Sequence, residues 1–433
     1  MKSLWINSVN KPTFDKLTRD IKTDVLIIGG GITGILCAYM LKKANVDYVL
    51  VEADEIGKGI TQNTTAKITF QHGLIYDKLI KKYCTEYASL YFEANKNALE
   101  KYREIAKNID CDFEEKDSFV YSTLNKLKIE KECEAYQKIG IKAEYFDKLS
   151  LPLSIEGAVK IRNQAQFHPL KFVYSVSNVL NVYENTKVIN IEPNKVLTNN
   201  GSITAKKIIV ATHFPIINKH GAYFMKLYQH RSYVLALENA DEINGMYVDE
   251  NDKGMSFRNY GNLLLVGGGG HRTGKKGGNW QELREFSKTH YPDAIEKFWW
   301  ATQDCMSLDG VPYIGLCSKN TSDLYVATGF NKWGMTSAMV AAELIRDLIL
   351  DIKNPYEQVF NPSRSIFQPQ LCANLFESAV NLLTPTAPRC PHLGCALKYN
   401  KAEHSWDCPC HGSRFTEKGK LIDNPSTDDI NLK

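Results

Sequence analysis

Short, continuous apolar runs recur along the chain at residues 25–28, 48–51, 208–211 and 324–327. Runs of this length without polar alternation are typical of strands that are buried on both faces of a parallel sheet. Helix-like segments follow the first and the last of these runs, and residues 220–300 contain many strand-like segments. The pattern therefore predicts an α/β fold that is interrupted by a β-rich (α+β) domain.

The first apolar run leads directly into a glycine-rich turn. This turn contains Gly29, Gly31, Ile32, Thr33 and Gly34 in the spacing G-x-G-x-x-G. Such a turn lets the backbone approach a pyrophosphate, and the N–H groups of the following helix face the phosphates. The second run ends on Glu52, whose carboxylate can accept hydrogen bonds from a ribose. We therefore expect a dinucleotide, FAD or NAD; the alternative is a β-turn-α joint without a ligand.

Composition and charge narrow the class of protein. The 433 residues are 43% hydrophobic and 24% charged, with a net charge of +4. This is the composition of an ordinary globular protein that is long enough for two or three cores. No block of Lys and Arg indicates nucleic acid binding, no run suits a membrane helix, and the first residues do not resemble a secretory signal. We expect a cytoplasmic protein with no nucleic acid partner and no membrane span.

The eleven cysteines form two groups. Seven are scattered, as reduced cytosolic thiols usually are. The other four, Cys390, Cys395, Cys408 and Cys410, lie within 21 residues near the C-terminus. Such crowding without a secretory signal indicates a metal or redox site.

A long polar loop at residues 57–67 follows Glu52 and contains Thr61, Thr65 and Ala66. Small hydroxylated residues suit a segment that passes phosphates and ring edges, and an ordinary solvated loop is the alternative.

With these pieces in place, residues 20–350 resemble the D-amino-acid-oxidase superfamily of FAD-dependent oxidoreductases. That family includes glycine and sarcosine oxidases and γ-glutamylputrescine oxidoreductase. The resemblance adds further cofactor-binding residues, namely Val188, Ala211, Thr212, Gly329, Trp333, Gly334, Met335 and Thr336. It implies FAD as the cofactor, and a helix whose first N–H groups, at residues 334–336, face the flavin C2=O.

The resemblance also suggests domain boundaries. We expect a discontinuous, Rossmann-like FAD-binding domain at residues 20–82, 150–218 and 301–352. We expect a substrate domain at 83–149 and 219–300, a linker at 353–385 and a small C-terminal β module at 386–433.

Catalytic candidates come from positions that match the family. They are Lys67, His72, His168, Arg231, Tyr233, Gln303 and Asp304. For each, a structural salt bridge or a satisfied polar group in the core is the alternative. Amino-acid oxidases of this family carry an Arg that clamps the substrate carboxylate shortly before residue 309, and residues 302–307 contain none. We therefore expect a small amine-like substrate.

Near the C-terminus, the chain contains Cys-x-His followed after 15 residues by Cys-x-x-His. These motifs resemble the Rieske [2Fe–2S] family. The resemblance assigns Cys390 and Cys408 to one iron, and His392 and His411 to the other. It also makes Cys395 and Cys410 a disulfide pair; a structural zinc site is the alternative.

The C-terminal module departs from that family in one respect. A full Rieske domain has several strands before its first cluster loop, and the stretch between the linker and Cys390 is too short and too proline-rich for them. Either the flavin domain supplies the missing support, or the site is a remnant that holds its cluster weakly.

The sequence as a whole predicts an FAD-dependent oxidoreductase that acts on a C–N bond. Electrons would pass through the Rieske cluster to an external acceptor. One alternative is an FAD/iron–sulfur electron relay without an amine substrate. The other is a non-catalytic redox sensor with a structural metal site.

Overall fold

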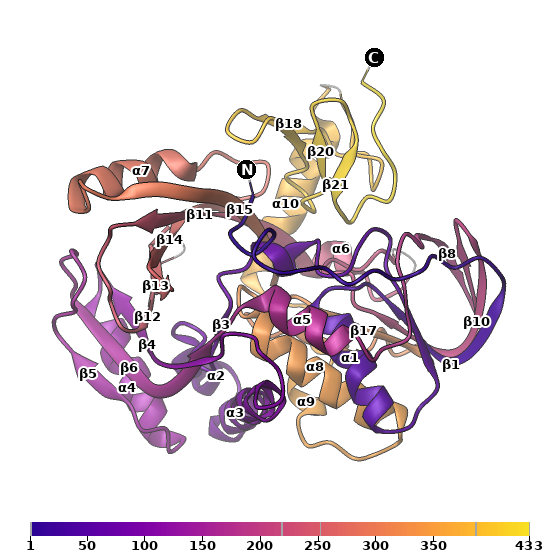
Figure 1. The fold of residues 1–433 in the computed structure, drawn as a ribbon, viewed down its shortest axis with the longest axis horizontal. Coiled ribbons are helices and arrows are strands. Elements are labelled where there is room, and N and C mark those ends of the chain that lie inside the picture. Colours follow the sequence, from indigo (N-terminus) through magenta and orange to yellow (C-terminus); the bar gives the residue numbers. More distant parts are fainter. Residues whose placement is uncertain (1, 218–219, 252, 386–387, 433) are drawn as a thin grey trace.

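A computed structural model describes residues 2–217, 220–251, 253–385 and 388–432 (Figure 1). Its first sheet has eight strands. Their order is β16 (Tyr313–Leu316), β17 (Leu324–Thr328), β10 (Gly201–Val210), β1 (Ile21–Ile28), β2 (Tyr48–Val51) and β7 (Val182–Tyr183), and β8 (Val188–Glu192) and β9 (Lys195–Thr198) form a hairpin beside β10. The strands from β17 to β7 are parallel, so the four apolar runs are buried strands as expected.

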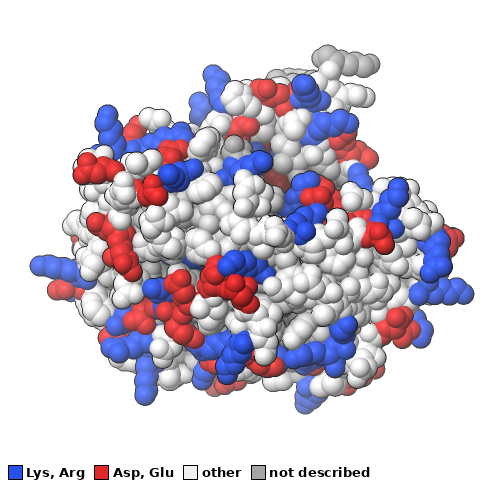
Figure 2. Space-filling view, viewed as in Figure 1, with Lys and Arg blue, Asp and Glu red and all other residues white. Residues whose placement is uncertain are grey.

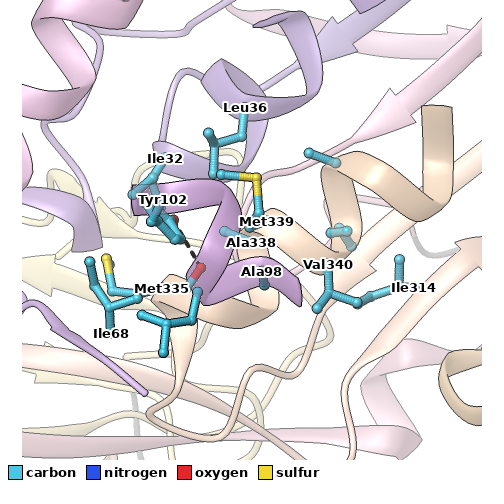
Figure 3. Packing of buried hydrophobic residues seen from close by; sticks show 14 of the residues in the cluster. Ile32, Leu36, Ile68, Ala98, Tyr102, Ile314, Met335, Ala338, Met339 and Val340 are labelled. Atoms are coloured by element: carbon cyan, nitrogen blue, oxygen red, sulfur yellow. Dashed lines mark hydrogen bonds between the residues drawn. The ribbon is translucent and has the colours of Figure 1, made fainter. Parts of the chain in front are cut away.

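Helices cover one face of this sheet, whose strands are apolar on both faces. Helices α1 (Ile32–Lys43) and α8 (Gly334–Ile349) contact its strands, and α3 (Thr85–Ala106) and α5 (Pro169–Ser177) pack on these two helices. Figure 3 shows α8 packing through Met335 and Met339 against Leu36 of α1 and Tyr102 of α3, and the Tyr102 hydroxyl donates to the Met335 carbonyl at 2.9 Å. This packing fixes the N-terminus of α8 relative to the glycine-rich turn.

The second sheet has nine strands and is largely antiparallel. Its order is β15 (Ile295–Ser307), β11 (Leu227–Glu238), β14 (Leu263–Arg272), β13 (Ser256–Tyr260), β12 (Met246–Asp249), β4 (Glu114–Ser122), β6 (Gly157–Gln166) and β3 (Lys67–Ile68), with β5 (Glu144–Phe146) beside β6. β3 and β6 thus lie in this sheet, although the proposed boundaries put their residues in the FAD-binding domain. The reason is that β6 pairs with β4 and β5.

The remaining helical segments are mostly short. They are η1 (Ile60–Asn63), α2 (Ile75–Lys82), α4 (Lys126–Lys138), α6 (Tyr223–Lys226), α7 (Asn279–His290), α9 (Glu357–Phe360) and α10 (Pro369–Leu383). No helix in the described ranges is long and apolar enough to cross a membrane. Figure 2 shows cationic and anionic side chains interspersed over the visible face, in keeping with the small net charge.

The C-terminal module is a four-stranded antiparallel sheet. Its strands are β18 (Lys398–Asn400), β19 (Ser405–Asp407), β20 (Arg414–Thr416) and β21 (Leu421–Asp423). Between α10 and β18, apart from residues 386–387, which lie outside the described ranges, the chain forms a single β-bridge from Arg389 to Ala396 and no strand. Helix α10 lies beside this module (Figure 1).

Candidate functional site: a flavin cavity and a cluster site on two shared strands

The glycine-rich turn has no room for a side chain at Gly29 or Gly34. Gly29 has φ +112°, and a Cβ there would lie 2.6 Å from the Ala211 carbonyl oxygen. A Cβ at Gly34 would lie 1.9 Å from the Gly29 carbonyl oxygen, so helix α1 can pack this closely only with glycine. The Ile32 N–H is held by the Thr61 hydroxyl at 3.0 Å. The turn is therefore a rigid backbone cradle at a helix N-terminus, as phosphate binding requires.

Glu52 lies at the end of β2 beside this cradle. Its carboxylate accepts hydrogen bonds from the N–H groups of Gly30 at 2.6 Å and Asp54 at 2.9 Å. Burial raises the pKa of this carboxyl, and the two N–H groups oppose the shift. The side chain is thus fixed where a ribose would follow the phosphates.

A cavity of about 1220 Å³ connects the cradle with the nine-stranded sheet. Most of the predicted cofactor-binding residues line it, namely Gly29, Gly31, Ile32, Thr33, Glu52, Thr61, Thr65, Val188, Ala211, Thr212, Trp333, Gly334 and Met335. Gly34, Ala66, Gly329 and Thr336 do not line it, and instead support the residues that do. The volume, the cradle and the N-terminus of α8 fit a large dinucleotide such as FAD.

His72 lies on the cavity beside the start of α8. Its ring stacks on Trp333, and Nε2 is 3.0 Å from the Thr336 hydroxyl while Nδ1 is 2.6 Å from the Tyr91 hydroxyl. Burial lowers the pKa of His72 to about 3. A neutral, hydrogen-bonded ring therefore positions the N-terminus of α8.

Lys67 and Asp304 also line the cavity, and their pKa values are shifted towards neutrality. Burial lowers the pKa of Lys67 to about 7, and nearby Arg258 adds to the effect. Burial raises the pKa of Asp304 to about 6. Both groups can therefore exchange a proton near pH 7, which is typical of residues that act on a substrate.

His168 lies away from the cavity lining. It caps the N-terminus of α5, where Nδ1 accepts a hydrogen bond from the Lys171 N–H at 3.1 Å and Nε2 contacts the Ser8 hydroxyl at 2.7 Å. These contacts use both ring nitrogens. The structure thus gives His168 the alternative role that we considered, a satisfied polar group in the core.

The two cluster loops bring the predicted metal ligands together. Cys390 and Cys408 are buried, and the rings of His392 and His411 lie 4.9 Å apart. Neither nitrogen of the buried His411 has a well-formed hydrogen bond within the described ranges, although the Phe224 backbone is close. Cys395 and Cys410 form a disulfide between the loops.

The separation of these ligand atoms favours a cluster over zinc. Four ligands on one tetrahedral zinc, at Zn–S distances near ~2.3 Å, lie within about 4 Å of one another. In the described residues, the group of three or more possible ligands whose ligand atoms all lie within 4.8 Å of one another is Cys395, Cys408 and Cys410, two of which form the disulfide. The four predicted ligands do not all lie within that distance of one another, and two thiols and two imidazoles suit a [2Fe–2S] cluster.

The flavin domain supports the loop that carries His411. Gln229 Nε2 donates to the carbonyl oxygens of His411 and Asn424, both at 2.9 Å. Gln303 Nε2 donates to the Gly412 carbonyl at 2.9 Å, and Arg272 donates to those of Pro409 at 3.1 Å and Cys410 at 3.2 Å. These contacts agree with the first alternative for the shortened module, in which the rest of the chain supplies its support, because they come from β11, β14 and β15.

A buried network of ion pairs also joins the C-terminal module to strand β11. Glu403 of the module, with a fully buried side chain, accepts hydrogen bonds from Arg231, from Arg414 at 2.8 Å and from the Tyr233 hydroxyl at 3.0 Å. Arg231 and Gln303 therefore contact the module and do not line the cavity, whereas Tyr233 does both. The structure places these catalytic candidates mainly at the domain contact.

The cavity and the loop that carries His411 contact largely alternate side chains of β11 and β15, and residues 421–424 of the module also line the cavity. Along β15, Thr302 and Asp304 line the cavity, while Gln303 between them contacts the cluster loop. Tyr228 and Ser232 of β11 line the cavity, while Gln229 and Arg231 contact the module. Side chains alternate between faces in a strand, so β11 and β15 lie between the cavity and the loop that carries His411.

Sequence reasoning missed four residues at this contact, namely Gln229, Arg272, Glu403 and Arg414. The available signal was the run of polar residues in an otherwise apolar segment at 229–232. This polar run predicts buried polar groups, but it does not predict which residues they contact.

Comparisons with known proteins agree with this geometry. The family model of the FAD dependent oxidoreductases (DAO) matches residues 24–348, and that of the Rieske [2Fe-2S] domain matches residues 375–432. The putative Rieske 2Fe-2S iron-sulfur protein YhfW of Bacillus subtilis is 35% identical over 98% of this chain and 96% of its own. Gamma-glutamylputrescine oxidoreductase of Escherichia coli is 29% identical over 48% of this chain and 53% of its own.

Among solved structures, glycine oxidase from Geobacillus kaustophilus superimposes with a TM-score of 0.67 at 18% identity. The match covers 80% of this chain and 99% of the oxidase, and it shows the fold. The chain belongs to the DAO family of FAD-dependent oxidoreductases and carries a C-terminal Rieske [2Fe–2S] domain.

Proposed function

We propose that the protein oxidises the C–N bond of a small amine-type substrate at its FAD and passes the electrons through the Rieske cluster to an external acceptor. One observation carries this proposal: residues of β11 and β15 line the flavin cavity, and other residues of the same two strands bind the cluster loop. A two-electron donor site and a one-electron site that contact the same two strands have a short route for electrons between them.

The cavity supports an amine substrate. FAD supplies the hydride acceptor when bound. Asp304 offers a carboxylate to an ammonium group, and Lys67, with a pKa of about 7, can take up the proton that an amine must lose before oxidation. No arginine lies at residues 302–307 to clamp a carboxylate. Two of the matched proteins, glycine oxidase and gamma-glutamylputrescine oxidoreductase, are named for amino compounds.

The fixed position of the module supports internal electron transfer. Glu403 is buried between Arg231 and Arg414, and Gln229 and Gln303 bind the backbone of the cluster loop. Neutral imidazole ligands raise the potential of a [2Fe–2S] centre relative to an all-thiolate one, so electrons from a flavin can reach it.

Anaerobic titration of the purified protein with a panel of mono-, di- and polyamines tests the proposal. We expect one class of amine to bleach the flavin and also to reduce the cluster, detected by absorbance and by electron paramagnetic resonance. Bleaching by NADH or dithionite alone would replace the proposal with an electron relay. Iron-containing protein in which no reductant couples the two centres would favour a sensor.

A further inference from the structure

Helix α10 has its polar side facing inwards. Asn374, Glu377 and Asn381 are buried: Asn374 accepts a hydrogen bond from Arg272 at 3.0 Å, and Glu377 pairs with Lys275 at 2.7 Å. The outward face is apolar, and it consists of Cys372, Ala373, Leu375, Phe376, Ala379, Val380, Leu382 and Leu383. Phe376 is 70% exposed and Leu383 is 83% exposed. A helix normally has the opposite arrangement, so the outward face requires a partner.

The spacing of these residues indicates that the partner is another helix. Cys372, Phe376, Ala379 and Leu383 follow one another at intervals of four, three and four residues. These are the intervals of the a and d positions that form the contact between two paired helices. The one charged residue of α10, Glu377, faces inwards, so no charge would be buried in such a contact.

The same face is complementary to itself when two copies run antiparallel. A two-fold axis between Glu377 and Ser378 sets Phe376 opposite the partner's Ala379, and Cys372 opposite the partner's Leu383. The same axis sets Ala373 opposite Leu382, and Leu375 opposite Val380, of the other copy. Large residues thus meet small or medium ones across the axis, as close packing of an isologous interface requires.

The available area also suits a dimer. With Phe367 beside the helix, the exposed parts of the large apolar side chains amount to roughly 600 Å², if a whole large side chain offers roughly 170 Å². This equals the largest apolar patch of a typical monomer, and it is most of the roughly 800 Å² that each partner buries in a standard interface.

We propose that the protein forms a two-fold dimer through antiparallel pairing of α10 with the α10 of a second copy. The Asn381 carbonyl accepts the Ala396 N–H at 2.9 Å, so the paired helices would adjoin the first cluster loop of each copy. The second copy covers the apolar face, and the polar face stays on the flavin domain.

Sedimentation of the full chain gives the first test. We expect twice the mass of one chain at micromolar concentration. Phe376→Glu sets like charges near the two-fold axis and should weaken dimerisation at least 100-fold. Leu127→Glu, at a leucine of α4 that is also exposed, should leave the dimer intact. A wild-type monomer at 100 µM would overturn the proposal, and so would binding to anionic lipid vesicles that Phe376→Glu abolishes.

Cross-linking tests the antiparallel register. In a Cys84→Ser background, Leu383→Cys should form an intermolecular disulfide with Cys372 under a mild oxidant such as diamide. The neighbouring variant Leu382→Cys should not. Cys372 alone should not cross-link either, because its two copies would lie roughly 16 Å apart at 1.5 Å per residue. A Cys372–Cys372 cross-link would show a different pairing and contradict the proposed axis.

Discussion

At the scale of single residues, the positions with the least freedom are those where the backbone must approach a ligand. Gly34 is the clearest example, because a Cβ there would lie 1.9 Å from the Gly29 carbonyl oxygen. Gly34→Ala must push α1 away from β1 and open the cradle. We expect purified Gly34→Ala to lose its flavin, with at least a 100-fold weaker affinity in a fluorescence titration. Gly59→Ala, where an added Cβ would meet no described atom beyond its chain neighbours within 4 Å, should retain flavin; flavin bound equally by both variants would contradict the assignment.

Lys67 supplies the pH dependence that we expect of the reaction. Burial lowers its pKa to about 7, so its amine is charged below this pH and neutral above it. A neutral Lys67 can accept the substrate proton, and flavin bleaching should therefore become faster as the pH rises through about 7. In Lys67→Met this inflection should disappear, while Lys78→Met, at another lysine on the cavity, should keep it. Stopped-flow absorbance between pH 6 and 9 measures the bleaching rate of both variants. A pH profile that is unchanged in Lys67→Met would exclude the role of Lys67 as proton acceptor.

At the scale of elements, β11 and β15 connect the two sites, and the Glu403 network fixes the module on them. Burial alone would raise the pKa of Glu403, but Arg231 and Arg414 outweigh it and hold the pKa below its ordinary value. Its contribution to stability is therefore complete above about pH 4.3 and is lost as the pH falls through the lowered value.

Glu403→Gln should consequently destabilise the module. Removing one partner of a buried ion pair costs about 3–5 kcal/mol, because the remaining charges stay buried. The measurement is the denaturant midpoint at which the cluster absorbance is lost. Glu417→Gln, at an exposed glutamate of the same module, should leave the midpoint unchanged. Equal midpoints for both variants would show that the network contributes little.

The elements that could be predicted from sequence are those with local signals. The apolar runs, the glycine-rich turn and the Cys and His motifs are defined by neighbouring residues. In the structure, the runs form buried strands, the turn begins helix α1, and the two Cys and His motifs lie side by side. The roles of Arg231 and Gln303 could not be predicted, because their partners Glu403 and Gly412 lie more than 100 residues away.

At the scale of the whole molecule, a Rieske module without its usual base is held by a flavin domain. Gln303 lies at the centre of this contact and does not line the cavity. Gln303→Leu should change the rate of flavin bleaching by amines less than about threefold, because the cavity face of β15 is unaltered. Reduction of the cluster after bleaching should slow at least tenfold, at unchanged iron content. Equal slowing of both steps would place Gln303 in the flavin reaction.

The central claim is that electrons pass between the two centres within one molecule. Anaerobic single-turnover mixing with a bleaching amine, followed at flavin and cluster wavelengths together, tests it most directly. The flavin should be reduced first and the cluster second, at a rate that does not change when the protein concentration is raised tenfold. A cluster that stays oxidised, or a second step whose rate increases in proportion to protein concentration, would contradict the claim.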